Sequence, residues 1–261
     1  MQIDKEQNAQ NAINLFLSQS CAFIMPHSTH PFAHWVGSGV IIQTNGSNVV
    51  ILTAKHVAED ARREKYSLGY FRCSNSLPDF VAGVMLSPHD IDVGLLVVKD
   101  SLAGSIRCLA VTPDALNVDG KDIVEHDNII LIGYPWQISH YDHGENEQGF
   151  TSITYWCVPD NVSLDSKGRY RLEWTDATIG PGRQDFDLPS PIGMSGGPLW
   201  RFRKPTGPLL WSASSIGKVI GIQSAWDDIG KKTLFIEPNR IWCDWLTNSL
   251  DQVDQTFRKS S

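Results

Sequence analysis

Gly193-Met194-Ser195-Gly196-Gly197-Pro198 is the most informative stretch of this sequence. A serine that attacks a carbonyl group must be exposed on a tight turn, with backbone N–H groups directed at the oxygen that becomes charged. Glycines on both sides of Ser195 permit the backbone angles that such a turn requires. The segment therefore predicts a nucleophilic Ser195, with the N–H groups of Gly193 and Ser195 as candidates for an oxyanion hole. The alternative is a glycine-rich hairpin turn with an inert serine.

Two further segments supply the groups that a nucleophilic serine needs. In Ile51-Leu52-Thr53-Ala54-Lys55-His56, an apolar strand ends in small residues and then presents a histidine, which is a suitable general base. In Asp90-Ile91-Asp92-Val93-Gly94-Leu95-Leu96, an aspartate opens an otherwise apolar strand. A buried carboxylate needs a partner, and a histidine N–H is a suitable one. Each segment alone also fits an ordinary strand end, with a solvated histidine or a turn aspartate.

Short segments rich in β-branched residues alternate with turn signals along most of the chain. The expected strands are 35–43, 49–54, 80–86, 93–98, 128–134, 151–158, 170–174, a short one at 199, 219–225 and 233–236. A short amphipathic helix is expected over 9–17, and a final helix over about 238–250 that Trp242 and Trp245 pin to the body. Loops are expected over 135–150, 159–168 and 176–191. Many short strands closed by one helix predict an all-β barrel fold.

The order and spacing of the three motifs resemble the chymotrypsin-like (trypsin-like) serine protease family over roughly residues 35–250. Gly37-Ser38-Gly39 before the histidine strand and Gly221-Ile222-Gln223-Ser224 after the serine also match the family pattern. The resemblance implies an all-β fold of two six-stranded antiparallel β-barrels with a C-terminal helix. It implies a single protease domain, with about 20–110 as the N-terminal barrel, about 125–237 as the C-terminal barrel and 238–250 as the terminal helix.

The resemblance also implies a mechanism. Ser195 would be the nucleophile, His56 the general base and acid, and Asp92 the residue that orients His56, while the N–H groups of Gly193 and Ser195 hold the oxyanion. Asp90 is the alternative to Asp92, which we prefer because the apolar strand starts directly after it. The expected activity is that of a serine endopeptidase that forms an acyl-enzyme on a protein or peptide substrate and needs no cofactor and no metal.

The substrate preference of the specificity pocket is the property of the site that the sequence predicts least well. The resemblance places its walls at Pro189, Ser190 and Ile192 on one side and at Ser224, Ala225 and Trp226 on the other. No acidic residue stands at the expected floor, and Trp226 stands where the family usually has a small residue. We therefore expect a small or medium apolar residue before the scissile bond, although Asp185 and Asp187 leave a preference for a basic residue open.

The sequence departs from the secreted branch of the family at one position. Met194 stands where trypsin-type zymogens carry the aspartate that pairs with a new N-terminus, so activation by N-terminal cleavage is not expected. The bacterial Deg-type and viral branches also lack this switch, and 234–240 resembles the Deg-type end. A protease without the switch needs another restraint, for which narrow specificity, an inhibitory loop or a regulatory protein partner are candidates. A bacterial defence or quality-control setting is expected by analogy.

Composition narrows the setting. The 261 residues carry a formal net charge of -7 and no basic block, which argues against a nucleic-acid partner. The five cysteines are widely spaced without a C-x-x-C pair, so free thiols in a reducing compartment are expected. No secretory signal and no membrane-spanning run is recognisable, and a cytoplasmic protein is expected. The histidines at 27, 30 and 34 are interpreted as a loop rather than a metal site, because no carboxylate or cysteine is interleaved.

Two other functions remain open. One is a peptide-binding or scaffold module on the same fold, catalytically silent or gated by a partner. The other is an esterase of the α/β-hydrolase type, because 193–197 satisfies its Gly-x-Ser-x-Gly string. Against the esterase, His56 precedes the serine by a long interval and the expected elements are mostly strands.

Overall fold

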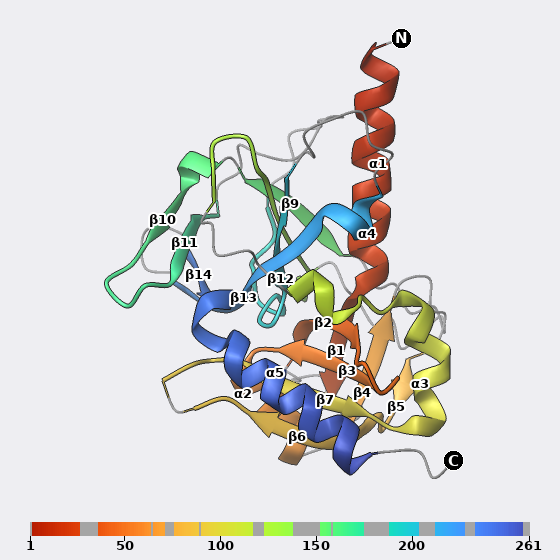
Figure 1. The fold of residues 1–261 in the computed structure, drawn as a ribbon. Helices are drawn as coiled ribbons and strands as arrows, with labels where there is room; N and C mark the ends of the chain where they lie inside the picture. Colours follow the sequence, from red (N-terminus) through yellow and green to blue (C-terminus); the bar gives the residue numbers. More distant parts are fainter. Residues whose placement is uncertain are drawn as a thin grey trace.

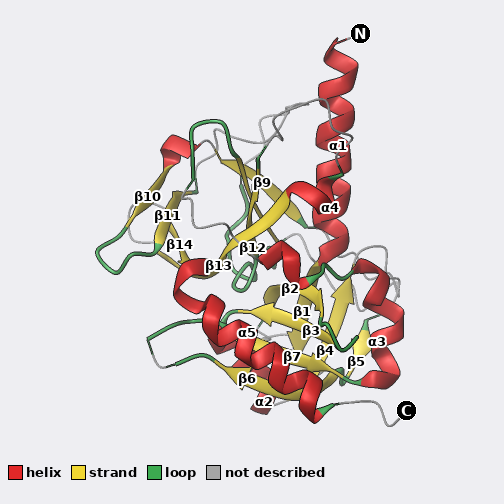
Figure 2. Cartoon of the chain, in the orientation of Figure 1, coloured by secondary structure: helices red, strands yellow, loops and turns green. Residues whose placement is uncertain are grey.

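The computed structural model describes residues 2–26, 36–63, 65–70, 76–88, 90–116, 123–137, 152–157, 159–174, 188–203, 212–227 and 233–257. They form two curled sheets, one above the other in Figure 1, with helix α1 (Gln2–Ser20) rising beside the upper sheet. Helix α5 (Asn239–Thr256) leaves the upper sheet and runs along the lower one. Strands dominate both layers (Figure 2), which confirms the predicted all-β class.

The first sheet has the strand order β5-β4-β1-β2-β3-β7-β6. Its strands are β1 (Cys21–Pro26), β2 (Gly37–Gln43), β3 (Val49–Thr53), β4 (Tyr66–Tyr70), β5 (Leu77–Pro78), β6 (Val81–Leu86) and β7 (Gly94–Val98). Helix α2 (Lys55–Arg63) follows β3 directly, and α3 (Asp100–Ile106) follows β7. Short 3-10 turns at Arg107–Leu109 and Pro113–Leu116 then lead towards the second sheet.

The second sheet has the strand order β10-β11-β14-β13-β12-β8-β9. Its strands are β8 (Asn128–Gly133), β9 (Ile153–Cys157), β10 (Val162–Leu164), β11 (Tyr170–Glu173), β12 (Pro198–Phe202), β13 (Gly217–Asp227) and β14 (Thr233–Pro238). A 3-10 turn at Pro159–Asn161 precedes β10, and α4 (Ala213–Ile216) precedes β13. Every ladder between these strands is antiparallel, which is not the parallel sheet of an α/β-hydrolase.

The structure differs from the prediction in several elements. Each sheet has seven strands within the described residues, where six were expected. Strands β1, β4 and β5 were not expected, and β10 lies inside 159–168, which was predicted to be a loop. The terminal helix extends to Thr256 rather than about 250, and α1 is longer than 9–17. Most of the other two predicted loops, 138–150 and 176–187, lies outside the described residues.

The strands nearest the candidate site follow from simple sequence rules. In β3 and β7 every residue is buried, because both strands are runs of β-branched residues and leucine in the middle of the sheet. The Asn45-Gly46 turn joins β2 to β3, and Ser47 adopts a left-handed backbone with φ 68°. Since Thr53 at the end of β3 is paired with Gly94 at the start of β7, the segments beyond these residues emerge at the same edge of the sheet.

A shared apolar core joins the two sheets. It includes Val40 and Leu52 of the first sheet, Ile130 and Trp200 of the second, and Trp242 of α5. Two further clusters lie within the individual sheets, one around β3 and α2 and one around β8, β11 and β12. The two halves are therefore packed as one body, and the surfaces that meet between them are held in a fixed relation.

Some expectations concern features outside the sheets. Cys21, Cys108, Cys157 and Cys243 are free thiols, whereas residue 73 lies outside the described part of the chain. Within that part, no helix has the length and apolar character needed to cross a bilayer. No cluster of potential metal ligands occurs there either, and the histidines at 27, 30 and 34 lie outside it.

Candidate active site

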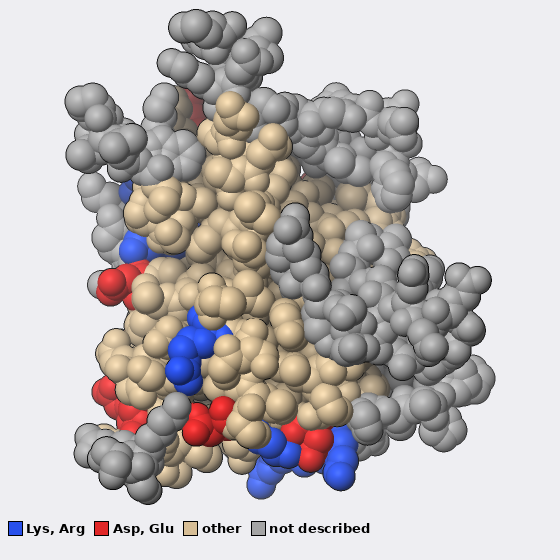
Figure 3. Space-filling view, turned by 90° about the vertical axis from the view of Figure 1, so that its right-hand side faces the viewer, with Lys and Arg blue, Asp and Glu red and all other residues tan. Residues whose placement is uncertain are grey.

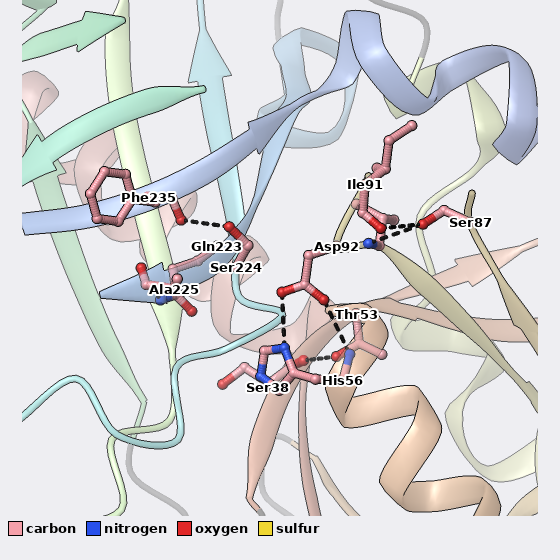
Figure 4. A network of polar contacts seen from close by, with 11 residues as sticks. Ser38, Thr53, His56, Ser87, Ile91, Asp92, Gln223, Ser224, Ala225 and Phe235 are labelled. Atoms are coloured by element: carbon pink, nitrogen blue, oxygen red, sulfur yellow. Dashed lines mark hydrogen bonds and ion pairs between the residues drawn. The ribbon is translucent and has the colours of Figure 1, made fainter. Parts of the chain in front are cut away.

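His56 and Asp92 meet at the edge of the first sheet. His56 lies in the first turn of α2, and Asp92 lies two residues before β7. The Nδ1 atom of His56 is 2.9 Å from Oδ2 of Asp92, and the backbone N–H of His56 donates to Oδ1 at 3.1 Å (Figure 4). A neutral imidazole that donates from Nδ1 keeps Nε2 free as a proton acceptor. Asp92, rather than Asp90, is thus the carboxylate in contact with His56.

The Asp92 carboxylate is held in place by its own loop. The Ser87 hydroxyl donates to the carbonyl oxygen of Ile91 at 2.7 Å and accepts a longer hydrogen bond from the N–H of Val93 at 3.4 Å. These bonds fix the backbone on both sides of Asp92 (Figure 4). Nearby, the Lys55 ammonium donates to the carbonyl of Ser87 at 2.9 Å, which ties the start of α2 to the same loop.

The charges around His56 favour its protonated form. Burial alone lowers the pKa of His56, but the hydrogen bond and negative charge of Asp92, together with the charges of Asp60 and Glu59, outweigh burial. The pKa of His56 is therefore raised above its usual value. A base with a raised pKa accepts a proton from an attacking hydroxyl more readily, although it is available in its neutral form only at higher pH.

The turn around Ser195 has its carbonyl groups held by hydrogen bonds. The pairs are Trp136 N–H to Ile192 O at 2.7 Å and Gly197 N–H to Met194 O at 2.7 Å. In a trans peptide the C=O and the N–H point in opposite directions. The N–H groups of Gly193 and Ser195 therefore point away from these anchored carbonyls, and neither donates to an acceptor among the described residues. Two such N–H groups on one turn suit a developing oxyanion.

Glycine is required at two positions of this turn. Gly193 has φ +95° and Gly196 has φ +90°, a region that other residues rarely adopt. At Gly196, a Cβ atom would also overlap the hydroxyl of Thr53 and the carbonyl oxygen of Ser38. The serine turn thus lies directly against the strand ends that carry His56.

Direct hydrogen bonds join the turn to the first sheet. The N–H of Ser38 in β2 donates to the carbonyl of Ser195 at 2.7 Å, and the hydroxyl of Thr53 donates to the carbonyl of Ser38 at 2.6 Å. Thr53 ends β3, three residues before His56. The sequence motifs therefore converge: the serine turn is tied to the strand that leads to His56, and His56 is tied to Asp92.

Gln223 was not identified from the sequence as part of this arrangement. Its carbonyl accepts from the N–H of Gly196 at 2.7 Å, and its N–H donates to the carbonyl of Gly197 at 2.9 Å. It is fully buried in β13. A sequence signal existed in the matching segment 221–224, but the role of Gln223 depends on contacts with a turn far away along the chain.

The residues predicted for the specificity pocket occupy two groups. In the first, Trp174 Nε1 donates to the carbonyl of Pro189 at 3.0 Å, and the N–H of Ser190 donates to Gln137 Oε1 at 2.6 Å. Ile192, next to the turn, is 45% exposed.

In the second group, Ser224 lies at an irregularity of β13, where its hydroxyl donates to the carbonyl of Phe235 at 3.2 Å. Ala225 pairs with Phe235, and Trp226 is half-buried against the core of the second sheet. Residues 185 and 187 lie outside the described part of the chain. The second group follows Gln223, whose carbonyl and N–H are hydrogen-bonded to Gly196 and Gly197 of the serine turn, and the first group runs directly into that turn.

A cavity of about 730 Å³ adjoins the His56–Asp92 pair. It is lined by Lys55 and Glu59 of α2, by Arg169 next to β11 and by Glu237 of β14. Burial raises the pKa of Glu237, the nearby Arg169 lowers it and the charge of Asp92 raises it further, with a net raised pKa. Glu237 therefore holds a proton more readily than an exposed glutamate, and its place beside His56 and Asp92 could not be predicted from its sequence neighbours.

The surface in Figure 3 bears on nucleic-acid binding. Among the described residues on this face, lysines, arginines, aspartates and glutamates are few: some lie along the left edge, one basic group lies near the middle, and acidic and basic residues are mixed along the lower edge. The described part of this face therefore has no continuous basic patch of the kind that nucleic-acid-binding proteins present.

The antiparallel sheets and the glycine-rich serine turn define the class of chymotrypsin-like serine peptidases. The chain belongs to the trypsin-like peptidase domain family, whose model matches residues 37–204. That match confirms the predicted family and supports the expectation of a serine-type endopeptidase. No curated protein sequence is significantly similar to the chain.

Solved structures support the same fold. A serine endoprotease from Yersinia pestis is similar at 18% sequence identity with a TM-score of 0.54, over 92% of this chain and 65% of that one. The chain thus spans slightly less than two thirds of that protein. The thermostable serine protease AL20 from an extremophilic microorganism is similar at 13% identity with a TM-score of 0.50, over 85% of this chain and 91% of that one.

Proposed function

We propose that the protein hydrolyses peptide bonds in protein substrates through Ser195, His56 and Asp92. The observation that carries the proposal is the 2.9 Å contact between His56 Nδ1 and Asp92 beside a serine turn whose Gly193 and Ser195 N–H groups are unengaged within the described residues. The contact orients His56 so that Nε2 is the acceptor, and the turn supplies paired donors. Membership of the trypsin-like family supports a peptide rather than another acyl substrate.

In the first half of the reaction, Ser195 Oγ attacks the scissile carbonyl carbon while its proton passes to Nε2 of His56. The negative charge that forms on the carbonyl oxygen is stabilised by the N–H groups of Gly193 and Ser195. The C–N bond then breaks, and His56 gives the proton to the departing amine. Asp92 stabilises the imidazolium that exists between these two proton transfers, consistent with the raised pKa of His56.

In the second half, water attacks the acyl-enzyme and gives a proton to His56. The ester bond to Ser195 breaks, and Ser195 Oγ recovers the proton from His56.

Binding subsites formed by Pro189, Ser190 and Ile192 and by Ser224, Ala225 and Trp226 complete the proposal. A reducing, intracellular setting is supported by the four cysteines in the described part of the chain, which are all free thiols; burial raises the pKa of two of them, Cys21 and Cys157. A restraining partner remains a proposal.

The proposal is tested by labelling with an alkyl fluorophosphonate, which forms an Oγ–phosphorus bond and releases fluoride. Wild type, Ser195→Ala and His56→Ala are compared, and the modified residue is located by mass spectrometry. We expect labelling at Ser195 that both substitutions abolish, because one removes the nucleophile and the other removes its base. Labelling that persists in Ser195→Ala would refute the assignment, and an unlabelled, folded wild type would favour the silent or partner-gated module.

A further inference from the structure

We propose that the Ser38 hydroxyl is a positioning group that keeps the serine turn in its oxyanion-binding conformation, an inference that rests on the proposed function. Ser38 belongs to β2 of the first sheet and is fully buried. It lies 155 residues before Gly193, with which it is in hydrogen-bond contact. Its role is to fix the orientation of peptide groups and not to touch the substrate.

The Ser38 hydroxyl connects two segments that adjoin the second sheet, one directly after β8 and one before β12. It donates to the carbonyl of Gly193 at 2.9 Å and accepts from the N–H of Tyr134 at 2.9 Å. Both groups are in buried residues, so each would be unpaired without the hydroxyl. The hydroxyl is thus the middle of a chain of hydrogen bonds that runs from Tyr134 through Ser38 to Gly193.

This series of hydrogen bonds supports the peptide group between Ile192 and Gly193, whose N–H is half of the proposed oxyanion hole. Two residues beyond Tyr134, the N–H of Trp136 donates to the carbonyl of Ile192 at 2.7 Å, and that carbonyl shares a peptide with the N–H of Gly193. The Ser38 hydroxyl therefore holds 134–136 against 192–193. Its contacts lie next to the Trp136–Ile192 hydrogen bond, which sets the direction of the Gly193 N–H. A glycine at φ +95° has little steric restraint of its own, so this orientation depends on such bonds.

The rest of the turn is anchored without charge. Met194 is fully buried, and a Cβ atom on Gly133 would lie 3.2 Å from its side chain. The Ser38 backbone adds the 2.7 Å bond to the carbonyl of Ser195. Burial of the Met194 side chain and the hydrogen bonds of Ser38 thus hold the turn without an ion pair at position 194.

The test measures how the rate of fluorophosphonate labelling of Ser38→Ala depends on the probe concentration. The curve gives a maximal rate constant and the probe concentration at which half of that constant is reached. Loss of one oxyanion-hole donor typically lowers a rate about 10²–10³-fold, so partial misorientation should lower the maximal rate constant about 10–100-fold. The half-saturating concentration should stay within about twofold, because the hydroxyl does not contact the probe. Ser20→Ala is the matched control, since it also removes a fully buried hydroxyl that donates to a carbonyl, that of Leu17.

Thermal unfolding separates positioning from stability. If Ser38 only stabilises the fold, Ser38→Ala and Ser20→Ala will lower the melting temperature while both keep the wild-type maximal rate constant, and that result overturns the inference. Ser38→Thr, which keeps the hydroxyl, should label faster than Ser38→Ala. Should Ser38→Ala fail to fold, Ser38→Cys gives the same test, because a thiol is a weaker donor. An unlabelled wild type would instead contradict the proposed function itself.

Discussion

Water can reach the contact between His56 and Asp92, because their side chains are 47% and 31% exposed. When His56 is protonated the two form an ion pair, whose attraction is therefore partly screened. The pKa of His56 nevertheless remains raised, because the hydrogen bond to Asp92 adds to the charges of Asp60 and Glu59. The pair therefore sets the pH range of the proposed activity.

The pH dependence of labelling should report this pair. His56 must be neutral to act as a base, so the labelling rate should rise with pH through a midpoint above 6.5, the ordinary histidine value. Asp92→Asn removes the charge that raises the pKa of His56, so the midpoint should fall, and the limiting rate should drop about 10⁴-fold. Asp90→Asn is the control, and a larger loss with Asp90→Asn than with Asp92→Asn would reverse the preference between the two aspartates.

Single residues differ in how far the sequence reveals them. His56, Asp92 and Ser195 stand in short motifs, since a strand end or a tight turn needs particular neighbours, and the contact between His56 and Asp92 could be anticipated. Ser38 and Gln223 also lie in matching segments, but their contacts are with residues far along the chain. Nothing local to either residue shows which peptide group its hydrogen bonds will fix.

At the scale of elements, α5 is the main connection beyond the shared core. It starts where β14 of the second sheet ends, and Trp242 Nε1 donates to the carbonyl of Glu237 at 2.9 Å. Near its other end, Asp254 accepts from the N–H of Gly46 at 2.7 Å, from Asn48 Nδ2 at 2.8 Å and from the hydroxyl of Thr44. One carboxylate thus fixes the β2–β3 turn of the first sheet to the helix.

Removing this carboxylate should loosen the attachment. Asp254→Ala should lower the free energy of unfolding by about 1–3 kcal/mol, because the Thr44 hydroxyl, the Gly46 N–H and the Asn48 amide lose a charged acceptor. Asp251→Ala is the matched control, since Asp251 is exposed on the same helix, and its effect should stay within about 0.5 kcal/mol. Urea denaturation measures both, and equal effects would show that the hydrogen bonds of Asp254 contribute nothing specific.

Elements were predictable where periodicity and turn residues agreed. The β2–β3 hairpin has an Asn-Gly turn between apolar strands, and both strands were expected. Strand β1 follows α1 without a turn residue and ends at Pro26, so no local signal separates it from the helix. Strands β5 and β10 are only two and three residues long, too short for alternation to identify. These strands exist because longer partners pair with them.

At the scale of the whole molecule, α1 is anchored through a few residues of the shared core. Leu17 is fully buried there, and Phe16 contacts Trp200 edge to face with ring centroids 5.3 Å apart. Leu15, on the other side of the helix, is 45% exposed. The helix therefore contributes to the packing between the two sheets although much of it extends beyond them (Figure 1).

Paired leucine substitutions should show this asymmetry. Leu17→Ala should destabilise the protein by about 2–5 kcal/mol, because it leaves a cavity in the core that both sheets share. Leu15→Ala removes the same atoms from an exposed position and should change the free energy of unfolding by less than about 0.5 kcal/mol. Guanidinium denaturation of both variants gives the comparison. Similar small effects would mean that α1 detaches without disturbing the core.

The position of α5 in the chain has a consequence for biosynthesis. Gly46 and Asp254 are 208 residues apart, so the β2–β3 hairpin leaves the ribosome long before the helix that fastens it. The serine turn also follows the whole first sheet in the order of translation. A nascent chain consequently carries both His56 and Asp92 without Ser195 while residues 93–194 are being made. Under the proposed function, a nascent chain that still lacks Ser195 has no nucleophile and cannot cleave its neighbours on the same polysome.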